Sequence, residues 1–209
     1  IGDNALGANT TASYNTAAGA SALLVNSTGA GNTAVGYAAL DANTTANYNV
    51  GVGMGALGTN STGANNVAVG SNALLANTTA GANTAVGQSA LLVNTTGASN
   101  VSIGAYTLDA NTTASNNVAV GYAALGANTT ASNNTAMGYN ALTANTTGGD
   151  NVAVGYKSLE SATTAANNTA VGKGALGTCV TGTFNTAVGK GALQTSTADE
   201  NTAVGYLAL

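Results

Sequence analysis

The 209-residue sequence lacks proline, histidine, tryptophan and arginine, and it contains one cysteine, three lysines and seven acidic residues. Without histidine, a serine or cysteine nucleophile has no imidazole base to activate it. The acidic residues are mostly far apart in the chain, which disfavours the paired carboxylates of a glycosidase. We therefore expect a protein that is not an enzyme and that binds no cofactor or metal ion.

The shortage of basic residues and of long apolar runs also limits the partners. Three lysines are too few for the basic groove that nucleic acids require. No apolar run approaches the roughly 20 residues of a membrane-spanning helix. We therefore expect neither nucleic-acid binding nor membrane insertion by this segment, and the single cysteine excludes an internal disulfide framework.

Large apolar residues are scarce as well. Leu, Ile, Val and Phe together number 37 of the 209 residues, which is below the ~20% at which disorder is expected. Disordered chains normally carry a high net charge, whereas the formal charge here is −4. Ala, Thr, Asn and Gly supply about two-thirds of the chain. Small uncharged residues in this proportion favour a repetitive, closely stacked structure.

The sequence consists of one unit repeated every 17 residues. A glycine recurs at this spacing from Gly2 to Gly189, and a last one, Gly205, follows after 16 residues. Each repeat glycine has Leu four residues later, and all but the first have Asn four residues earlier. The unit reads N-[TV]-A-V-G-Y-x-A-L-x-A-N-T-T-[AG]-x-x. Stacking of the units would align like residues in columns along the molecule.

The period favours a β-solenoid. Helical solenoids have units of roughly 33–47 residues, and recurrent Gly, Asn, Thr and Val disfavour helix. At ~3.3 Å per residue, one unit traces about 56 Å, enough for a flattened coil of two short strands and two turns around one layer of Val, Leu or Ala. A hairpin meander would favour Asn-Gly or Asp-Gly turns, and neither dipeptide occurs. We predict an all-β, parallel β-solenoid of twelve to thirteen coils, forming a single domain over residues 1–209.

Asparagine forms two columns in this arrangement. The Asn before each repeat glycine is predicted to lie at a corner, where stacked amides hydrogen-bond along the column. This first asparagine column comprises Asn15, Asn32, Asn49, Asn66, Asn83, Asn100, Asn117, Asn134, Asn151, Asn168, Asn185 and Asn201. The second asparagine column comprises Asn9, Asn26, Asn43, Asn60, Asn77, Asn94, Asn111, Asn128 and Asn145, and continues as Ala162, Cys179 and Ser196. We interpret Cys179 as a small filler of this slot, with a reactive thiol as the alternative.

The residues before each repeat glycine predict a strand with two unlike faces. In Val67-Ala68-Val69, as in most units, β-branched residues flank an alanine, so alternation places alanine on the opposite face. A uniform alanine face implies that another flat surface packs closely against it. That surface is either the far wall of a thin coil or another subunit. Because a narrow coil has little apolar area to bury, we expect oligomerisation. The repeat glycine itself suits a positive φ or a close backbone approach.

Two further columns are expected at the surface. The residue after the repeat glycine forms the tyrosine column, and Lys173 and Lys190 in the same column indicate that it is exposed. Exposed tyrosine offers a large amphipathic contact, so its members are candidates for an adhesive surface; the alternative is that they cover a neighbouring coil or subunit. These tyrosines are Tyr37, Tyr122, Tyr139, Tyr156 and Tyr206. Pairs such as Thr44-Thr45 should likewise turn one hydroxyl outward in each coil.

Three segments carry a resemblance to known fibrous proteins. Residues 66–70 (N-V-A-V-G), 100–104 (N-V-S-I-G) and 151–155 (N-V-A-V-G) closely resemble the N-S-V-A-I-G-x-x-[SA] repeat of trimeric autotransporter adhesin heads. Runs of the type N-T-A-V-G-Y-x-A-L are similar to repeats in phage tail-fibre shafts. The resemblance implies a left-handed parallel β-roll that assembles as a homotrimer. The unit here is longer than the adhesin-head repeat, and its extra residues fall on the Asn-Thr-Thr side.

These features predict a structural, non-enzymatic segment of an extracellular fibre or adhesin, at a cell or virion surface. Its partners would be copies of itself, as a homotrimer or a head-to-tail filament, and a host surface, glycan or receptor contacted through a repetitive Thr/Asn/Tyr surface. No capping unit precedes Gly2 or follows Gly205, and solenoid ends normally carry one. We therefore expect a section of a longer fibre, or coils that stack end to end.

Ice binding is the alternative function. A flat β-solenoid with an outward threonine ladder can present ordered hydroxyls to a crystal face. The recurring pair is adjacent Thr-Thr, however, and not the Thr-x-Thr spacing that places two hydroxyls on one face of a strand.

Overall fold

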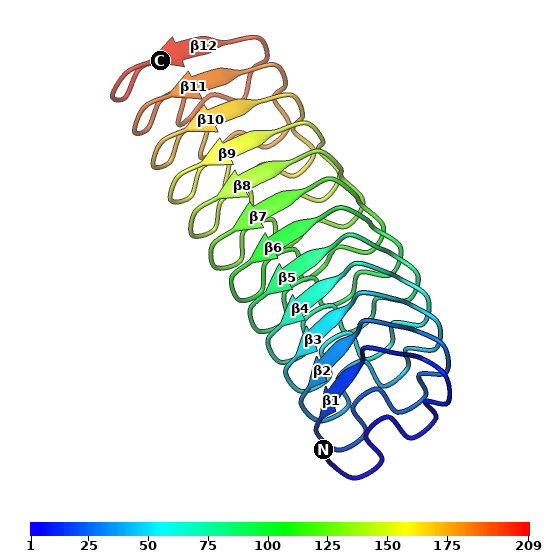
Figure 1. Cartoon of the computed structure of the whole chain (residues 1–209). Coiled ribbons are helices and arrows are strands. Elements are labelled where there is room, and N and C mark those ends of the chain that lie inside the picture. Colours follow the sequence, from blue (N-terminus) through cyan, green and yellow to red (C-terminus); the bar gives the residue numbers. More distant parts are fainter.

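The computed structural model describes residues 1–209 as a single rod of stacked coils (Figure 1). Each coil contributes one three-residue strand, and the twelve strands form one parallel sheet in chain order. Their bounds are β1 Thr16–Ala18, β2 Thr33–Val35, β3 Val50–Val52, β4 Val67–Val69, β5 Thr84–Val86, β6 Val101–Ile103, β7 Val118–Val120, β8 Thr135–Met137, β9 Val152–Val154, β10 Thr169–Val171, β11 Thr186–Val188 and β12 Thr202–Val204.

The strand register follows the sequence repeat. Thr33 of β2 pairs with Val50 of β3, 17 positions later. All the strand pairs from β1–β2 to β10–β11 have this same offset of 17. Only the pair β11–β12 is offset by 16, as at Thr186 and Thr202, so the shorter last unit is absorbed outside the strands. The parallel β-solenoid with 17-residue coils predicted from the sequence is confirmed.

Each coil contains only one strand, where two were expected. The rest of the coil is made of turns that contain left-handed residues in nearly every coil. In the second complete coil these are Ala38, Leu40 and Tyr48, with φ of 51°, 53° and 57°. Left-handed backbone is uncommon outside glycine, and each such residue turns the chain sharply. The path therefore bends too often for a second extended segment to form.

The interior is a thin layer of leucine and alanine. The leucine four residues after each repeat glycine is fully buried in ten successive coils, from Leu23 to Leu176, and the central alanine of most strands is buried beside it. The valine next to the repeat glycine faces outward instead; Val35, for example, is 40% exposed. Of the two explanations for the alanine face, the structure therefore supports the thin coil.

The repeat glycine lies where the backbones of adjacent coils come closest. Gly36 has φ of +130°, and a Cβ added to it would lie 2.6 Å from the carbonyl oxygen of Gly53 in the next coil. Its equivalents from Gly2 to Gly189 have the same conformation and the same near collision. Both reasons foreseen for a glycine, positive φ and close approach, apply at this position.

The chain forms no helix, and so no helix that could cross a membrane.

Candidate functional site

The first asparagine column lies inside the rod and connects successive coils. The backbone N–H of Asn49 donates to Asn32 Oδ1 at 2.9 Å, and Asn49 Nδ2 donates to the carbonyl of Gly63 at 2.8 Å. Asn49 Oδ1 in turn accepts from the backbone N–H of Asn66 at 2.9 Å. This pattern repeats along the column, whose members from Asn32 to Asn185 are buried. These side chains hold the coils together and contribute nothing to the surface.

The second asparagine column is also buried, and it is joined to the first. Asn77 Nδ2 donates to Asn60 Oδ1 at 2.8 Å and to the carbonyl of Ala80 at 2.9 Å. The same Ala80 carbonyl accepts from Asn66 Nδ2 of the first column at 2.9 Å. One carbonyl thus links the two ladders, and every buried side-chain polar atom of the chain has a partner.

The second column ends without leaving a buried oxygen unpaired. Asn145 faces Ala162 in the next coil, and its Oδ1 accepts from the backbone N–H of Gly148 at 3.2 Å. Further on, Cys179 fills the slot as a fully buried side chain with its Sγ 3.7 Å from the Gly182 carbonyl. Burial raises the pKa of this thiol, so it is suited to packing rather than to reaction.

A threonine column runs along the outside of the rod. In the pairs from Ser27-Thr28 to Thr163-Thr164, the second residue is exposed, while the first is partly covered and donates its hydroxyl to a carbonyl of the neighbouring coil. Thr44 Oγ1, for example, donates to the Ser61 carbonyl at 3.2 Å. Each coil therefore presents one free hydroxyl of this pair. The exposed members are Thr11, Thr28, Thr45, Thr62, Thr79, Thr96, Thr113, Thr130, Thr147, Thr164 and Thr181.

The outer face of the strands forms a second continuous surface, which we call the strand face. Its residues are the first and third of each strand; they are Thr, Val, Ile, Met or Ala in all twelve strands and never charged. Ile103 and Met137 are each 41% exposed. Sequence reasoning found the two-sided strand but not that its β-branched side faces outward.

The tyrosine column is exposed, and its members interact with one another. Tyr122, Tyr139 and Tyr156 lie on successive coils with ring centroids 5.5 Å apart and planes within 12° of parallel. Lys173 follows them with its Nζ 5.3 Å from the Tyr156 ring centroid. Tyr37 stands alone at the other end of the rod and is 63% exposed.

The last members of this column form a cation–aromatic pair. Lys190 Nζ lies 5.1 Å from the ring centroid of Tyr206, which is itself 68% exposed. The column therefore reads Tyr, Tyr, Tyr, Lys, Lys, Tyr from Tyr122 to Tyr206. We call its last four residues, from Tyr156 to Tyr206, the lysine–tyrosine cluster.

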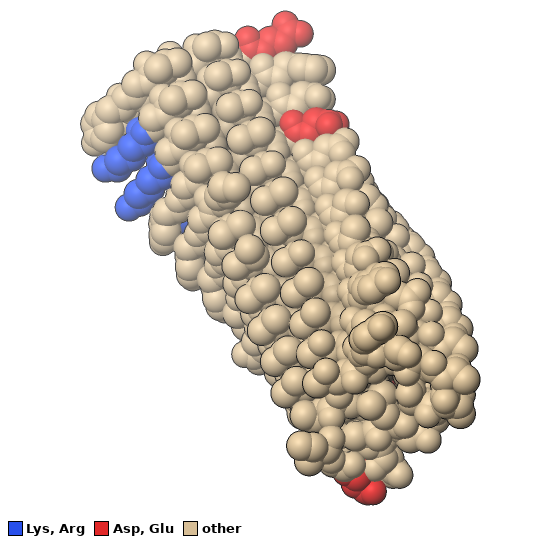
Figure 2. Space-filling model, in the orientation of Figure 1, with Lys and Arg blue, Asp and Glu red and all other residues tan.

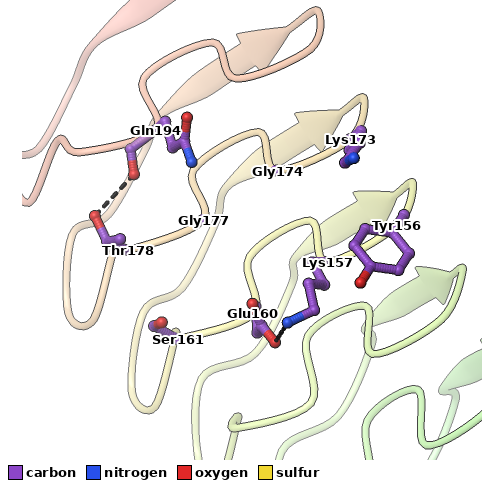
Figure 3. Close-up of a pocket in the computed structure, with 9 residues that line it drawn as sticks. All are labelled: Tyr156, Lys157, Glu160, Ser161, Lys173, Gly174, Gly177, Thr178 and Gln194. Atoms are coloured by element: carbon purple, nitrogen blue, oxygen red, sulfur yellow. Dashed lines mark hydrogen bonds and ion pairs between the residues drawn. The ribbon is translucent and has the colours of Figure 1, made fainter.

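A polar hollow of about 200 Å³ adjoins this cluster (Figure 3). Its lining comprises Tyr156, Lys157, Glu160, Ser161, Lys173, Gly174, Gly177, Thr178 and Gln194. Tyr156 is the one hydrophobic residue among them. Gly174 and Gly177 have no side chains to fill the space between adjacent coils, and Thr178 Oγ1 donates to the backbone carbonyl of Gln194 at 2.8 Å.

Charge is unevenly distributed around the rod. Lysine side chains gather along one edge near the C-terminal end, and the acidic groups visible in the same view lie on other edges (Figure 2). Lys157 Nζ lies 2.8 Å from Glu160 Oε1, and this hydrogen bond raises the pKa of the lysine. It is the only ion pair of the chain, so Lys173 and Lys190 have no carboxylate partner. Sequence reasoning missed the hollow, although the two glycines that open it were a visible signal.

No cluster of residues suited to a metal ion is present. No protein-family model, no curated protein and no solved structure gives a significant match to the chain.

Proposed function

We propose that this chain is a structural, non-enzymatic segment of an extracellular fibre, and that it assembles with copies of itself through the strand face. The observation that carries the proposal is the composition of this face: it is uncharged along the whole rod and includes half-exposed Val, Ile and Met side chains. Extended uncharged surfaces with exposed aliphatic side chains mark interaction sites in soluble proteins.

The size of the strand face is suited to association with a second copy. Twelve strands spaced ~4.8 Å apart, each three residues of ~3.3 Å long, cover on the order of 500–600 Å². Two such faces would bury about 1,100 Å² together, which reaches the ~1,000 Å² that a specific interface requires. Two copies of one chain present surfaces of equal length and matching 17-residue repeat, so the uncharged face is complementary to itself.

The resemblance to adhesin heads and phage fibre shafts supports a homotrimer in which three strand faces meet. The threonine and tyrosine columns would then form the outer surface that contacts a host surface, glycan or receptor. Neither asparagine column would take part, because both are buried.

Native mass spectrometry tests the assembly. We expect the wild-type chain to be oligomeric at micromolar concentration, and the double variant Ile103→Glu/Met137→Glu to be monomeric with an unchanged circular dichroism spectrum. The matched control, Thr79→Glu/Thr113→Glu, places the same charges on the threonine column and should leave the oligomer intact. A monomeric wild type, or an equal effect of both double variants, would contradict the proposal.

Ice binding receives less support from the geometry. The threonine column offers one free hydroxyl per coil in a single row, and the paired hydroxyl is engaged by a carbonyl, as at Thr44. A row of this kind does not form a two-dimensional array. We expect no thermal hysteresis in a solution of the chain.

A further inference from the structure

We propose that the lysine–tyrosine cluster and the adjoining hollow bind an acidic polysaccharide that lies along the rod. This inference deepens the proposed role of the rod as a surface that contacts a glycan, because it names the class of ligand and the site.

The two lysines without a carboxylate partner favour an anionic ligand. The chain has three lysines and a formal charge of −4, yet all three lysines lie within or beside the cluster. Lys157 is paired with Glu160, whereas Lys173 and Lys190 project from adjacent coils about 4.8 Å apart without a carboxylate. Lys173 Nζ leans over Tyr156 of the preceding coil and Lys190 Nζ over Tyr206 of the following coil. Both ammonium groups are exposed, and an anionic ligand along the column would neutralise both.

The rings on either side favour a sugar as the carrier of the anionic groups. Tyr156 and Tyr206 flank the two lysines in the same column, and each ring has an ammonium group near its face. Tyr156 is stacked on Tyr139 on one side and has Lys173 on the other, so it offers its edge and its hydroxyl. Tyr206, the last member of the column and 68% exposed, offers apolar ring surface to the C–H groups of a sugar. A purely inorganic anion would make no use of the two rings.

The hollow supplies hydrogen-bonding groups for sugar hydroxyls. Its lining includes the Gln194 amide and the hydroxyls of Ser161 and Thr178, and its floor is opened by Gly174 and Gly177. Such a lining fits a ligand rich in hydroxyls better than an apolar one. The hollow also lies beside Tyr156 and Lys173, so one sugar unit can enter it while its neighbours follow the column.

The repeating geometry favours a polymer over a single sugar. Lys173 and Lys190 occupy equivalent positions in consecutive coils, so they match anionic groups that recur along a chain. Nucleic acid is a weaker candidate. The lysine–tyrosine cluster has no arginine to bind phosphate with two parallel hydrogen bonds, and it offers too few cations for a phosphate backbone.

Isothermal titration calorimetry at low salt tests the proposal with a galacturonate hexamer, its carboxyl-reduced neutral counterpart and a thymidine hexanucleotide. We expect the acidic hexamer to bind at least ~10-fold more tightly than the neutral one, as expected when charge-assisted hydrogen bonds are lost. Lys173→Gln/Lys190→Gln should weaken its binding to a similar extent, and Lys173→Arg/Lys190→Arg should retain most of it.

Two tyrosine variants provide a matched control. Tyr206→Ser should weaken binding of the acidic hexamer several-fold, while Tyr37→Ser, in the same column but far from the lysines, should leave it unchanged. The proposal is overturned if the acidic hexamer does not bind, if the lysine-to-glutamine variant binds it as well as the wild type, or if the hexanucleotide binds at least as tightly. Retention of the wild-type oligomer in these experiments would show that the failure concerns the ligand site and not the proposed fibre.

Discussion

Replacement of Asn77 by alanine is expected to destabilise the rod more than any substitution on its surface. The side chain is fully buried in the middle of the second asparagine column. It donates to Asn60 Oδ1 at 2.8 Å and to the Ala80 carbonyl at 2.9 Å, and its Oδ1 accepts from Asn94 Nδ2 at 3.1 Å. Alanine removes all three hydrogen bonds at once.

The magnitude follows from the groups that lose their partners. The Ala80 carbonyl still accepts from Asn66 Nδ2, so losing its hydrogen bond from Asn77 costs little stability. Asn60 Oδ1 can accept from the backbone N–H of Gly63, as Asn145 Oδ1 does from Gly148 beside Ala162. One N–H of Asn94 remains buried without a partner, which costs about 1–3 kcal/mol. We expect a loss of about 2–4 kcal/mol in the free energy of unfolding, which adds the lost hydrogen bonds of Asn77 to the cost of this unsatisfied group.

The control is a substitution at Ala162, where the chain itself carries alanine in the second asparagine column. Ala162→Asn extends the ladder by one amide, which can donate to Asn145 Oδ1, and is expected to stabilise the rod by about 1 kcal/mol. Both variants and the wild type are unfolded in guanidinium chloride at equal concentration and followed by circular dichroism. The reasoning is refuted if Asn77→Ala costs less than about 1 kcal/mol, or if Ala162→Asn destabilises the rod by more than Asn77→Ala does.

Three further predictions concern the backbone, the thiol and pH. Gly104→Ala adds a Cβ at φ of +128° that would collide with the next repeat glycine, so it should lower the free energy of unfolding in guanidinium chloride by at least ~3 kcal/mol. Gly126→Ala, whose Cβ would have its nearest contact at 3.4 Å, should be tolerated. Equal losses of stability in the two variants would contradict this. Because Cys179 is buried and its thiol pKa is raised by burial, Ellman's reagent should label it only as fast as the chain unfolds, and rapid labelling of the folded chain would be evidence against the filler role. Burial raises the pKa of Asp41 and of Asp109, so the folded chain binds these protons more tightly than the unfolded chain. Their contribution is present at acidic pH and is lost as the pH rises through the raised pKa values. Between pH 4 and 7, the free energy of unfolding should therefore fall less in Asp41→Asn/Asp109→Asn than in the wild type. Identical pH profiles of the two proteins would count against the raised pKa values.

The sequence was sufficient for the class of fold because every unit carries the same residues at the same spacing. The invariant glycine, the leucine four residues later and the two asparagines each predict a column, and strand pairing at an offset of 17 follows directly. Stacked amides were also foreseeable, because an Asn side chain can both donate to and accept from its own kind.

The cross-section of the coil could not be predicted in the same way. Propensity gives no reason to expect left-handed backbone at Leu40 or Tyr48, because this conformation is unfavourable for both residue types. The stacked neighbours impose it, with backbone hydrogen bonds such as Leu40 N–H to the Ala56 carbonyl at 3.0 Å. These turns eliminate the second strand, and the interior is filled by one leucine and small residues in each coil.

The candidate site was foreseen only in its outline. Exposure of the tyrosine column followed from the lysines within it, but the hollow depends on Gly174 and Gly177 lying beside Gln194 of the next coil. Which side chains become neighbours across coils depends on the shape of the turns. That shape is a property of the stack and not of a single unit.

The most direct test of the account is whether copies of the chain meet at the strand face. Ile103→Cys places a thiol on that face, and Thr96→Cys places one on the threonine column; the native Cys179 is buried in both. Under mild oxidation at micromolar concentration, we expect the Ile103→Cys variant to form a disulfide-linked dimer rapidly and the Thr96→Cys variant to remain uncrosslinked. Equal rates in the two variants, or no crosslink through position 103, would contradict the assembly proposed for this fibre segment.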